Sequence, residues 1–374
     1  MTHRERLLAI LDGQPPDRIP WIPRLLLWYN ARQKTGTMPP EYAGLSLRQL
    51  EKALGMGTPA RDGQVFRTVL HDVEVTSYPD GRGTITEYRT PRGTLTSRTE
   101  RTARMEDLDL GALEVEHLIK GPQDYAAAEY LVEHTEYLPT YEEYLAYEEE
   151  IGDDGYPLVH AGDCPFHDWL QKWAGYGRAY FDLHDYPERV ERLLEVMTQV
   201  HKERLWPLIA QSPARLILHG LHFSSLMTPP PLFEKYILPY YQEFSALLHQ
   251  HHKRLCFHAD ADTSQLLELI RQAGFDMAET FVTAPMVPCT LRQARETWGS
   301  DVIIWGGVPS VILEDPTPDE EFTAYMEELF TTIAPGDAFI LGVADNVMPA
   351  AKLDRLLQIT EMVEERGTYP IRTR

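Results

Sequence analysis

From residue 156 onward, the chain alternates short apolar runs with longer helical segments, and this rhythm limits the folds that it can adopt. Apolar runs of about five residues followed by helical patterns of about ten to twenty are typical of βα repeats in a parallel sheet or barrel. The sequence therefore predicts an α/β fold. We predict strands at 157–160, 214–219, 254–258, 275–279, 302–306 and 338–342, with helices near 187–205, 232–251, 263–273, 290–298, 318–333 and 350–365.

The length of 374 residues suits one (β/α)8 TIM barrel with an N-terminal elaboration, because such barrels typically need about 250 residues. We expect a single domain, 1–374, and the features expected before the repeats are a helix at 3–12, a first barrel strand within 21–29, a helix at 46–54 and helical, acidic residues at 122–150. Alternating β-rich runs broken by Pro-Asp-Gly and Pro-Arg-Gly turns predict a β-meander insertion over 65–105.

The composition excludes several classes of function. The 35 basic and 57 acidic residues give a formal charge of −22, which would repel nucleic-acid phosphates and anionic membranes. We therefore expect no nucleic acid and no membrane as partner. The N-terminus lacks a signal-peptide pattern and three dispersed cysteines oppose a disulfide framework, so we expect a cytoplasmic protein. Glycine-rich nucleotide motifs and a serine-nucleophile elbow are also missing from the sequence.

Each predicted strand ends in residues able to do chemistry, as expected where a barrel enzyme builds its active site. Strand alternation puts His258 and Asp260 on one side of the backbone, with Cys256 below them as packing. An imidazole and a carboxylate that converge in this way suit a metal site or acid/base chemistry. Substrate binding without a metal, or capping of the next helix at Asp262, is also open.

Other strand ends supply candidates that could contact a substrate. His222 could provide a ligand or hold a substrate oxygen, and we assign it a catalytic role. An aromatic pocket could receive a methylated ammonium by cation–π attraction or a methoxylated ring by stacking. Support of neighbouring groups and core packing are the alternatives for these histidines and aromatic residues. The substrate-binding candidates are Arg24, His160, Asp163, His219 and Trp305.

Recognisable motifs lie in both halves of the chain. They are Arg4-Glu5-Arg6-Leu7-Leu8-Ala9 with Pro16-Asp17-Arg18-Ile19-Pro20, Thr228-Pro229-Pro230-Pro231-Leu232-Phe233 with Ile237-Leu238-Pro239-Tyr240, His258-x-Asp260, and Ala273-Gly274-Phe275-Asp276. Together they resemble the uroporphyrinogen decarboxylase superfamily, and most closely its branch of cobalamin-linked methyltransferases. The resemblance implies a (β/α)8 barrel, in agreement with the strand pattern.

The same resemblance implies a metal site. The methyltransferase branch holds zinc with a His-x-Cys pair and a later cysteine, and related methionine synthases add a glutamate. In this sequence Asp260 and Asp345 occupy the two cysteine positions, and Glu279 matches the glutamate. The implied metal ligands are therefore His258, Asp260, Glu279 and Asp345. Carboxylates favour harder cations than thiolates do, but zinc also accepts carboxylate and imidazole ligands and is the divalent metal that we expect.

The resemblance further implies the activity. We expect a methyltransferase that moves a methyl group between a small methylated substrate, of methylamine, betaine or methoxyaromatic type, and a corrinoid carried by a partner protein. Its catalytic residues would be His258, Asp260 and His222, and a homodimer is compatible with the sequence. One alternative is a decarboxylase-like lyase, although the acidic charge and the single Arg24 oppose a substrate with many carboxylates. The other is a non-catalytic binding subunit with a decayed zinc site.

Overall fold

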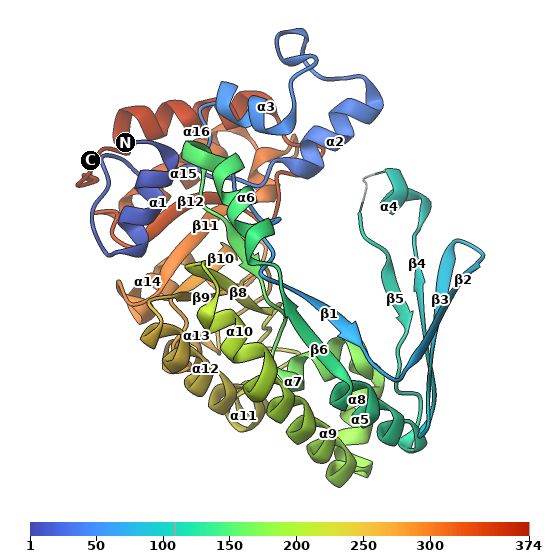
Figure 1. Cartoon of the computed structure of the whole chain (residues 1–374). Coiled ribbons are helices and arrows are strands. Elements are labelled where there is room, and N and C mark those ends of the chain that lie inside the picture. Colours follow the sequence, from blue (N-terminus) through green and yellow to red (C-terminus); the bar gives the residue numbers. More distant parts are fainter. Residues whose placement is uncertain (108–109, 374) are drawn as a thin grey trace. The chain divides into compact units, whose positions relative to one another are not determined.

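A computed structural model describes residues 1–107 and 110–373, and the chain divides into two compact units (Figure 1). Unit 1 comprises Met1–Gly63, Glu143–His160 and Ala214–Arg374, and unit 2 comprises Gln64–Glu142 and Ala161–Pro213. In sequence, unit 2 therefore interrupts unit 1 twice. The insertion predicted at 65–105 lies within unit 2, and the single domain over 1–374 stays a prediction.

Unit 1 is built on a six-stranded parallel sheet, which confirms the α/β class. The strand order is β12-β11-β10-β9-β8-β7, so strands that follow one another in the chain are also neighbours in the sheet. Each range overlaps the corresponding predicted strand. The strands are β7 (Leu158–His160), β8 (Leu216–Leu221), β9 (Arg254–His258), β10 (Met277–Phe281), β11 (Ile303–Pro309) and β12 (Phe339–Ala344).

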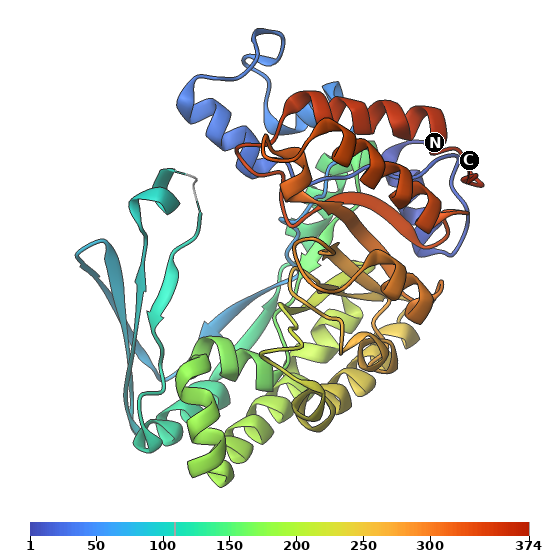
Figure 2. The ribbon, with the colours of Figure 1, turned by 180° about the vertical axis from the view of Figure 1, so that it is seen from behind.

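Helices connect these strands, as the βα rhythm predicts. They are α11 (Pro230–Leu232), α12 (Leu238–Gln250), α13 (Leu267–Gln272), α14 (Leu291–Trp298), α15 (Asp319–Ile333) and α16 (Leu353–Arg366). Helices α12, α13 and α14 run along the same face of the sheet (Figure 1). Helices α15 and α16 lie beside each other (Figure 2), where Arg366 forms an ion pair with Glu327 at 2.5 Å.

Single parallel bridges extend the sheet at both edges. Trp21 bridges Leu341 of β12, and Gly63 bridges Val159 of β7. The backbone N–H of Gly57 also donates to the carbonyl of Trp21 at 2.9 Å, so the two edge segments are bonded to each other. This arrangement agrees with a barrel of eight segments. The closed (β/α)8 barrel stays a prediction, because these two segments form bridges and not strands.

The pleat of the strands leads from the hydrophobic core to the polar strand ends. One side of the sheet packs against helix α1 (His3–Leu11). The core on this side contains Leu7, Ile10, Leu11, Ile22, Tyr156, Leu158, Leu216, Leu218, Cys256, Met277, Ile303, Trp305 and Ile340. The packing role predicted for Cys256 is thus confirmed. Two residues farther along β9 and β10 the same alternation presents His258 and Glu279.

The N-terminal strand prediction is wrong. Within residues 21–29 only the bridge at Trp21 is present, and helix α2 (Leu26–Thr35) begins at Leu26. A short apolar run has no period that separates a strand from a buried helix, which explains the error. The helix predicted at 46–54 is confirmed as α3 (Leu47–Ala53), capped by the Ser46 side chain, and a short 3-10 helix, η1 (Pro40–Tyr42), precedes it.

Unit 2 contains the predicted meander. Strands β2 (Glu74–Asp80), β3 (Gly83–Thr90), β4 (Gly93–Glu100) and β5 (Leu113–Glu116) form an antiparallel sheet in chain order. Strand β1 (Phe66–Leu70) instead pairs with β6 (Thr135–Pro139), a strand inside the region 122–150 that was predicted to be helical. The helices of unit 2 are α4 (Ala103–Asp107), α5 (Tyr125–Glu133), α7 (Pro165–Asp168), α8 (Tyr176–Asp185), α9 (Pro187–Val200) and α10 (Trp206–Gln211). Helix α6 (Tyr141–Ile151) belongs mostly to unit 1.

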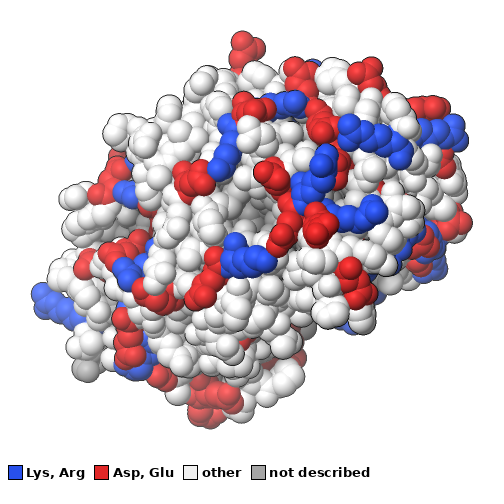
Figure 3. Space-filling view, turned by 90° about the horizontal axis from the view of Figure 1, so that it is seen from below, with Lys and Arg blue, Asp and Glu red and all other residues white. Residues whose placement is uncertain are grey.

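Two features of the structure concern nucleic acid and membranes, which we do not expect as partners: the distribution of surface charge and the character of the helices. On the face in Figure 3, lysine and arginine side chains lie among aspartates and glutamates. Within residues 1–107 and 110–373, no helix combines the length and the apolar character that crossing a bilayer requires. The three cysteines are buried free thiols.

Candidate active site

Polar side chains in or after four strands of unit 1, β8, β9, β10 and β12, meet at the C-terminal ends of these strands. His222 follows β8, His258 ends β9 and Asp260 follows it. Glu279 lies in β10, and Asp345 comes directly after β12. Because parallel strands present these ends at one edge of the sheet, residues more than 100 positions apart in sequence come together. The structure thus assembles the predicted catalytic and metal-binding residues in one cluster.

His258 lies at the centre of this cluster and is 5% exposed. Its Nδ1 is 2.7 Å from Oε2 of Glu279 and 2.8 Å from Oγ1 of Thr280. Its Nε2 faces the opposite carboxylates, at 3.4 Å from Oδ1 of Asp345 and 3.6 Å from Oδ2 of Asp260. The two ring nitrogens therefore have separate environments, one buried against β10 and one turned toward the cluster.

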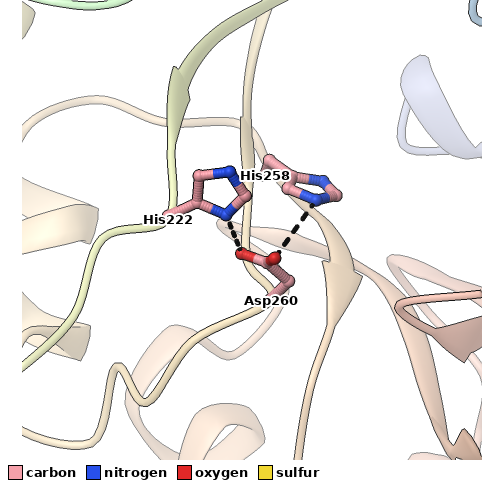
Figure 4. Close-up of side chains that lie close together, drawn as sticks. All are labelled: His222, His258 and Asp260. Atoms are coloured by element: carbon pink, nitrogen blue, oxygen red, sulfur yellow. Dashed lines mark hydrogen bonds and ion pairs between the residues drawn. The ribbon is translucent and has the colours of Figure 1, made fainter. Parts of the chain in front are cut away.

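His222 and Asp260 form the more exposed side of the cluster. His222 Nδ1 is 2.5 Å from Oδ1 of Asp260, and Figure 4 shows both histidine rings turning a nitrogen toward this carboxylate. Burial alone would raise the pKa of Asp260, but the hydrogen bond with His222 and the nearby His258 hold that pKa below its ordinary value. Asp260 is therefore ionised, and its carboxylate could bind a cation.

Two arginines bind the other carboxylates. Arg24 forms an ion pair with Asp345, and Arg61 forms one with Glu279. Burial of Glu279 would raise its pKa, but Arg61 and then His258 hold that pKa well below the ordinary range. Burial would also lower the pKa of Arg61, but Glu279 raises it. Glu279 is consequently a buried, ionised carboxylate whose negative charge is balanced by Arg61.

Two residues of the cluster have strained backbones. His222 has φ of 58° and Thr280 has φ of 52°, a region that a β-branched residue rarely occupies. Thr280 lies where β10 shifts register against β11, and Gly306 faces it, since a Cβ there would lie 2.6 Å from the Phe281 nitrogen. A bulge of this kind redirects side chains, and such strain gathers at functional sites.

The donor set fits a catalytic metal ion. His222, His258 and Asp260 each offer one ligand atom, and these atoms lie within 4.8 Å of one another. Two imidazoles and a carboxylate are a known ligand set for catalytic zinc, which keeps a fourth position for water or substrate. Of the other two predicted ligands, Asp345 also faces Nε2 of His258, whereas Glu279 lies on the Nδ1 side and binds Arg61. His222 was assigned a catalytic role, with metal ligation as one possibility, and was not among the four ligands that the resemblance implies.

A pocket of about 430 Å³ adjoins the cluster in unit 1. Its wall includes Arg24 and Arg61, whose ion pairs link it to the cluster. Apolar surface comes from Leu25, Leu47 and Ile151. This volume is within the range of small-molecule sites.

Some predicted substrate-binding residues have structural contacts instead. Trp305 is buried in the core, where its indole N–H donates to the carbonyl of Ile22 at 3.0 Å. His219 is fully buried, with Nδ1 3.0 Å from the Tyr241 hydroxyl and its ring packed on Phe244 of α12. These contacts support the core-packing alternative for both residues. Arg24, in contrast, lies at the cluster, where it forms an ion pair with Asp345. Its binding of a substrate stays a prediction.

The two remaining candidates lie at and beyond the end of β7. His160 ends that strand and is exposed. Asp163 belongs to unit 2 and is buried, where its carboxylate accepts from the Cys164 backbone at 2.7 Å and lies 2.8 Å from Nδ1 of His167. These contacts hold the start of α7. Substrate binding by His160 and Asp163 stays a prediction.

The sequence reasoning missed Arg61 and Thr280. Arg61 lies between Ala60 and the Gly63 bridge, in a segment with no apolar rhythm to identify it as an edge of the sheet. Thr280 follows Glu279 and would face the other side of a regular strand, but the bulge turns it toward His258. Only the hydrogen bonds of the folded chain reveal these two residues.

Comparisons with known proteins agree with this fold. Residues 171–366 match the family model of uroporphyrinogen decarboxylase (URO-D). Among solved structures, a methyltransferase from Methanosarcina mazei is similar with a TM-score of 0.52 and 15% identity, covering 98% of this chain and 99% of that chain. An isomerase from Streptomyces coelicolor A3(2) gives a TM-score of 0.23 and 10% identity, covering 81% of this chain and 100% of that chain, too low to bear on the fold. No curated protein matches.

Proposed function

Because the chain belongs to the uroporphyrinogen decarboxylase family, we propose that it is a metal-dependent enzyme that transfers a methyl group. The methyl group moves between a small methylated substrate and a corrinoid carried by a partner protein. The observation that supports this proposal is the convergence of His222, His258 and Asp260 at the strand ends. A site of this kind has the ligand types of catalytic zinc and an open side.

The chain's own residues prepare this site. His222, His258 and Asp260 would hold the ion, and Asp345, directly after β12, faces the same space. Glu279 and Thr280 fix the His258 ring, while Arg24 holds the Asp345 carboxylate. A divalent ion held by these residues would supply Lewis acidity toward the atom that carries the methyl group, which would improve that atom as a leaving group.

The adjoining pocket supports a small substrate with an apolar body. Glu51 lies in its wall, is 2% exposed and accepts a hydrogen bond from Thr58 at 2.7 Å. Burial raises the pKa of Glu51 to about 7. A methylated amine would give this carboxyl a positive partner, so methylamines and betaines are the first substrates to test, followed by methoxyaromatics.

Metal analysis combined with a methyl-transfer assay tests the proposal. The purified protein is expected to bind about one zinc ion and to transfer methyl groups from one substrate class to a corrinoid. Asp260→Ala and Asp345→Ala are expected to lose most activity, whereas Asp301→Ala, an exposed acid outside the cluster, serves as control. Full activity in both cluster variants would contradict the assignment. A protein that binds no metal and transfers no methyl group would favour a binding subunit.

A decarboxylase-like activity is the second candidate. Arg61 gives the cluster a second arginine beside Arg24, where the sequence suggested only one. Two guanidinium groups are better suited to an anionic substrate than one. Release of CO2 from uroporphyrinogen by the purified protein would favour this activity over methyl transfer.

A further inference from the structure

We propose that Arg61 is a positioning residue that acts through Glu279 to fix which nitrogen of His258 faces the candidate metal site. This inference rests on the proposed function only in assuming that Nε2 of His258 binds the metal. Arg61 donates a hydrogen bond to the buried Glu279, and it is Glu279 that contacts His258. Its role is therefore to hold a residue that holds the histidine.

The hydrogen bonds around Nδ1 determine where a ring proton lies. The Thr280 hydroxyl lies 2.7 Å from the Glu279 carbonyl and 2.8 Å from Nδ1 of His258, so when it donates its one proton to that carbonyl, its oxygen accepts from Nδ1. The Glu279 carboxylate, 2.7 Å from Nδ1, is also an acceptor. With two acceptors around it, Nδ1 carries a proton, whether the ring is neutral or charged. In the neutral ring, the lone pair is then on Nε2, which faces Asp260 and Asp345.

This arrangement needs Arg61 because Glu279 is 1% exposed. A carboxylate taken out of water requires a partner of opposite charge and fixed hydrogen bonds. Arg61 binds Oε1 of Glu279, and this leaves Oε2 aligned with Nδ1. Without the guanidinium, Glu279 has no fixed ion pair to hold its carboxylate plane, and the hydrogen bond that orients the His258 ring weakens.

The backbone around Arg61 is held on both sides. The carbonyl of Ala60 accepts from the Leu158 N–H at 2.9 Å, and Gly63 bridges Val159. The chain segment that carries the guanidinium is therefore attached to the edge of the same sheet that carries Glu279 and His258. An anchored arm of this kind fits a positioning role, because outer hydrogen bonds that orient a metal-binding histidine are known to tune metal affinity.

Proton NMR of the metal-free protein, with 15N-labelled histidine, tests the inference directly. The wild type is expected to show a slowly exchanging Nδ1–H signal for His258, identified by its loss in His258→Gln. In Arg61→Met we expect this proton to exchange at least about tenfold faster, and Arg61→Lys should restore part of the protection. Arg48→Met is the matched control, since Arg48 lines the same pocket but binds Asp154.

Zinc titration by calorimetry gives an independent readout. We expect Arg61→Met to bind zinc about 10- to 100-fold more weakly than the wild type, with Arg48→Met unchanged. An unchanged Nδ1–H signal together with unchanged zinc affinity in a folded Arg61→Met protein overturns the inference. If Arg61→Met does not fold, Arg61→Gln is assessed by the same two criteria. A wild type that binds no zinc contradicts the proposed function alone, and the exchange of the Nδ1 proton then decides the role of Arg61.

Discussion

At each of its two ends, the sheet of unit 1 carries a carboxylate that binds both a histidine and an arginine. At the N-terminal ends of the strands, Asp276 binds His249 at 2.8 Å, Arg254 at 2.9 Å and the Leu255 N–H at 2.7 Å. His249 and Arg254 are both partly exposed there. The two oxygens of this carboxylate together join α12 and β9 to the segment before β10.

At the C-terminal ends, Glu279 has the same two kinds of partner, His258 and Arg61. The difference lies beyond the histidine. His258 is buried and turns its second nitrogen toward Asp260 and Asp345, whereas His249 is 42% exposed on its side chain. The same three residue types therefore form a surface clamp at one end and part of a candidate catalytic site at the other. The two groups differ in the surroundings of the histidine nitrogen that does not bind the shared carboxylate. In His258 this nitrogen faces Asp260 and Asp345.

Replacing His258 and His249 by alanine, one at a time, should give the largest difference in activity between the two ends of the sheet. His258→Ala removes the central ligand, and we expect the proposed methyl transfer to fall by about 10²- to 10⁴-fold. His249→Ala should keep activity within about twofold, because its hydrogen bond is made to Asp276, at the opposite ends of the strands from the cluster. Steady-state rates of both purified variants check this expectation. Comparable losses of activity would erase the proposed distinction.

Neutralising Glu279, the carboxylate at the C-terminal ends of the strands, should have the next largest effect, which is on zinc affinity. Glu279→Gln keeps the shape of the side chain but loses the charge that pairs with Arg61 and accepts from His258. We expect zinc affinity to fall about 10- to 100-fold, as for other groups that orient a ligating histidine. Competition with a chelator of known affinity measures it. Zinc binding as tight as in the wild type would show that Glu279 does not tune the site.

Neutralising Asp276, the carboxylate at the N-terminal ends of the strands, should lower the stability of the protein instead. Asp276→Asn leaves the buried Leu255 N–H and the neighbouring cations without their charged acceptor. We expect the free energy of unfolding to fall by about 1–3 kcal/mol, with zinc affinity unchanged. Urea denaturation provides the first quantity. A weakened metal site in this variant would mean that the two ends of the sheet are coupled.

The smallest effect expected is a pH dependence of stability that arises from His249, at the N-terminal ends of the strands. The hydrogen bond with Asp276 raises the pKa of His249, with partial burial and Arg254 opposing it. Stability from a raised pKa is fully present below the unfolded value of about 6.5 and is lost as pH rises through the folded value. Compared with His249→Gln, the wild type should gain about 0.2–1 kcal/mol at pH 5 and almost nothing at pH 9. Thermal unfolding across this range would reveal a gain of the opposite sign.

The sequence predicted the members of the candidate site that follow from strand alternation. His258 and Asp260 share one side of β9, and the pattern of apolar runs located the strands that bring Glu279 and Asp345 near them. The positions of these strand ends followed from local periodicity and the common direction of parallel strands, whereas the choice of Asp260, Glu279 and Asp345 as metal ligands came from the family resemblance. The α/β class followed from the same rhythm.

Features that depend on irregular backbone could not be predicted in this way. Thr280 contacts His258 only because a bulge reverses the expected alternation, and Arg61 comes from a segment joined to the sheet by a single bridge. The apolar run at residues 21–29 fitted a strand or a buried helix equally well, and the structure forms the helix. Trp305 ends up in the core because its inward face meets α1.

The division of unit 1 among three stretches of the chain has a consequence for biosynthesis. Arg24 and its partner Asp345 are separated by 321 residues, so a ribosome needs about 15–65 s to add the second after the first. During that interval Arg61, too, waits for Glu279 to emerge. The nascent chain therefore carries an incomplete set of ligands until β12 has been made, and a chain arrested before Asp345 cannot assemble the full cluster.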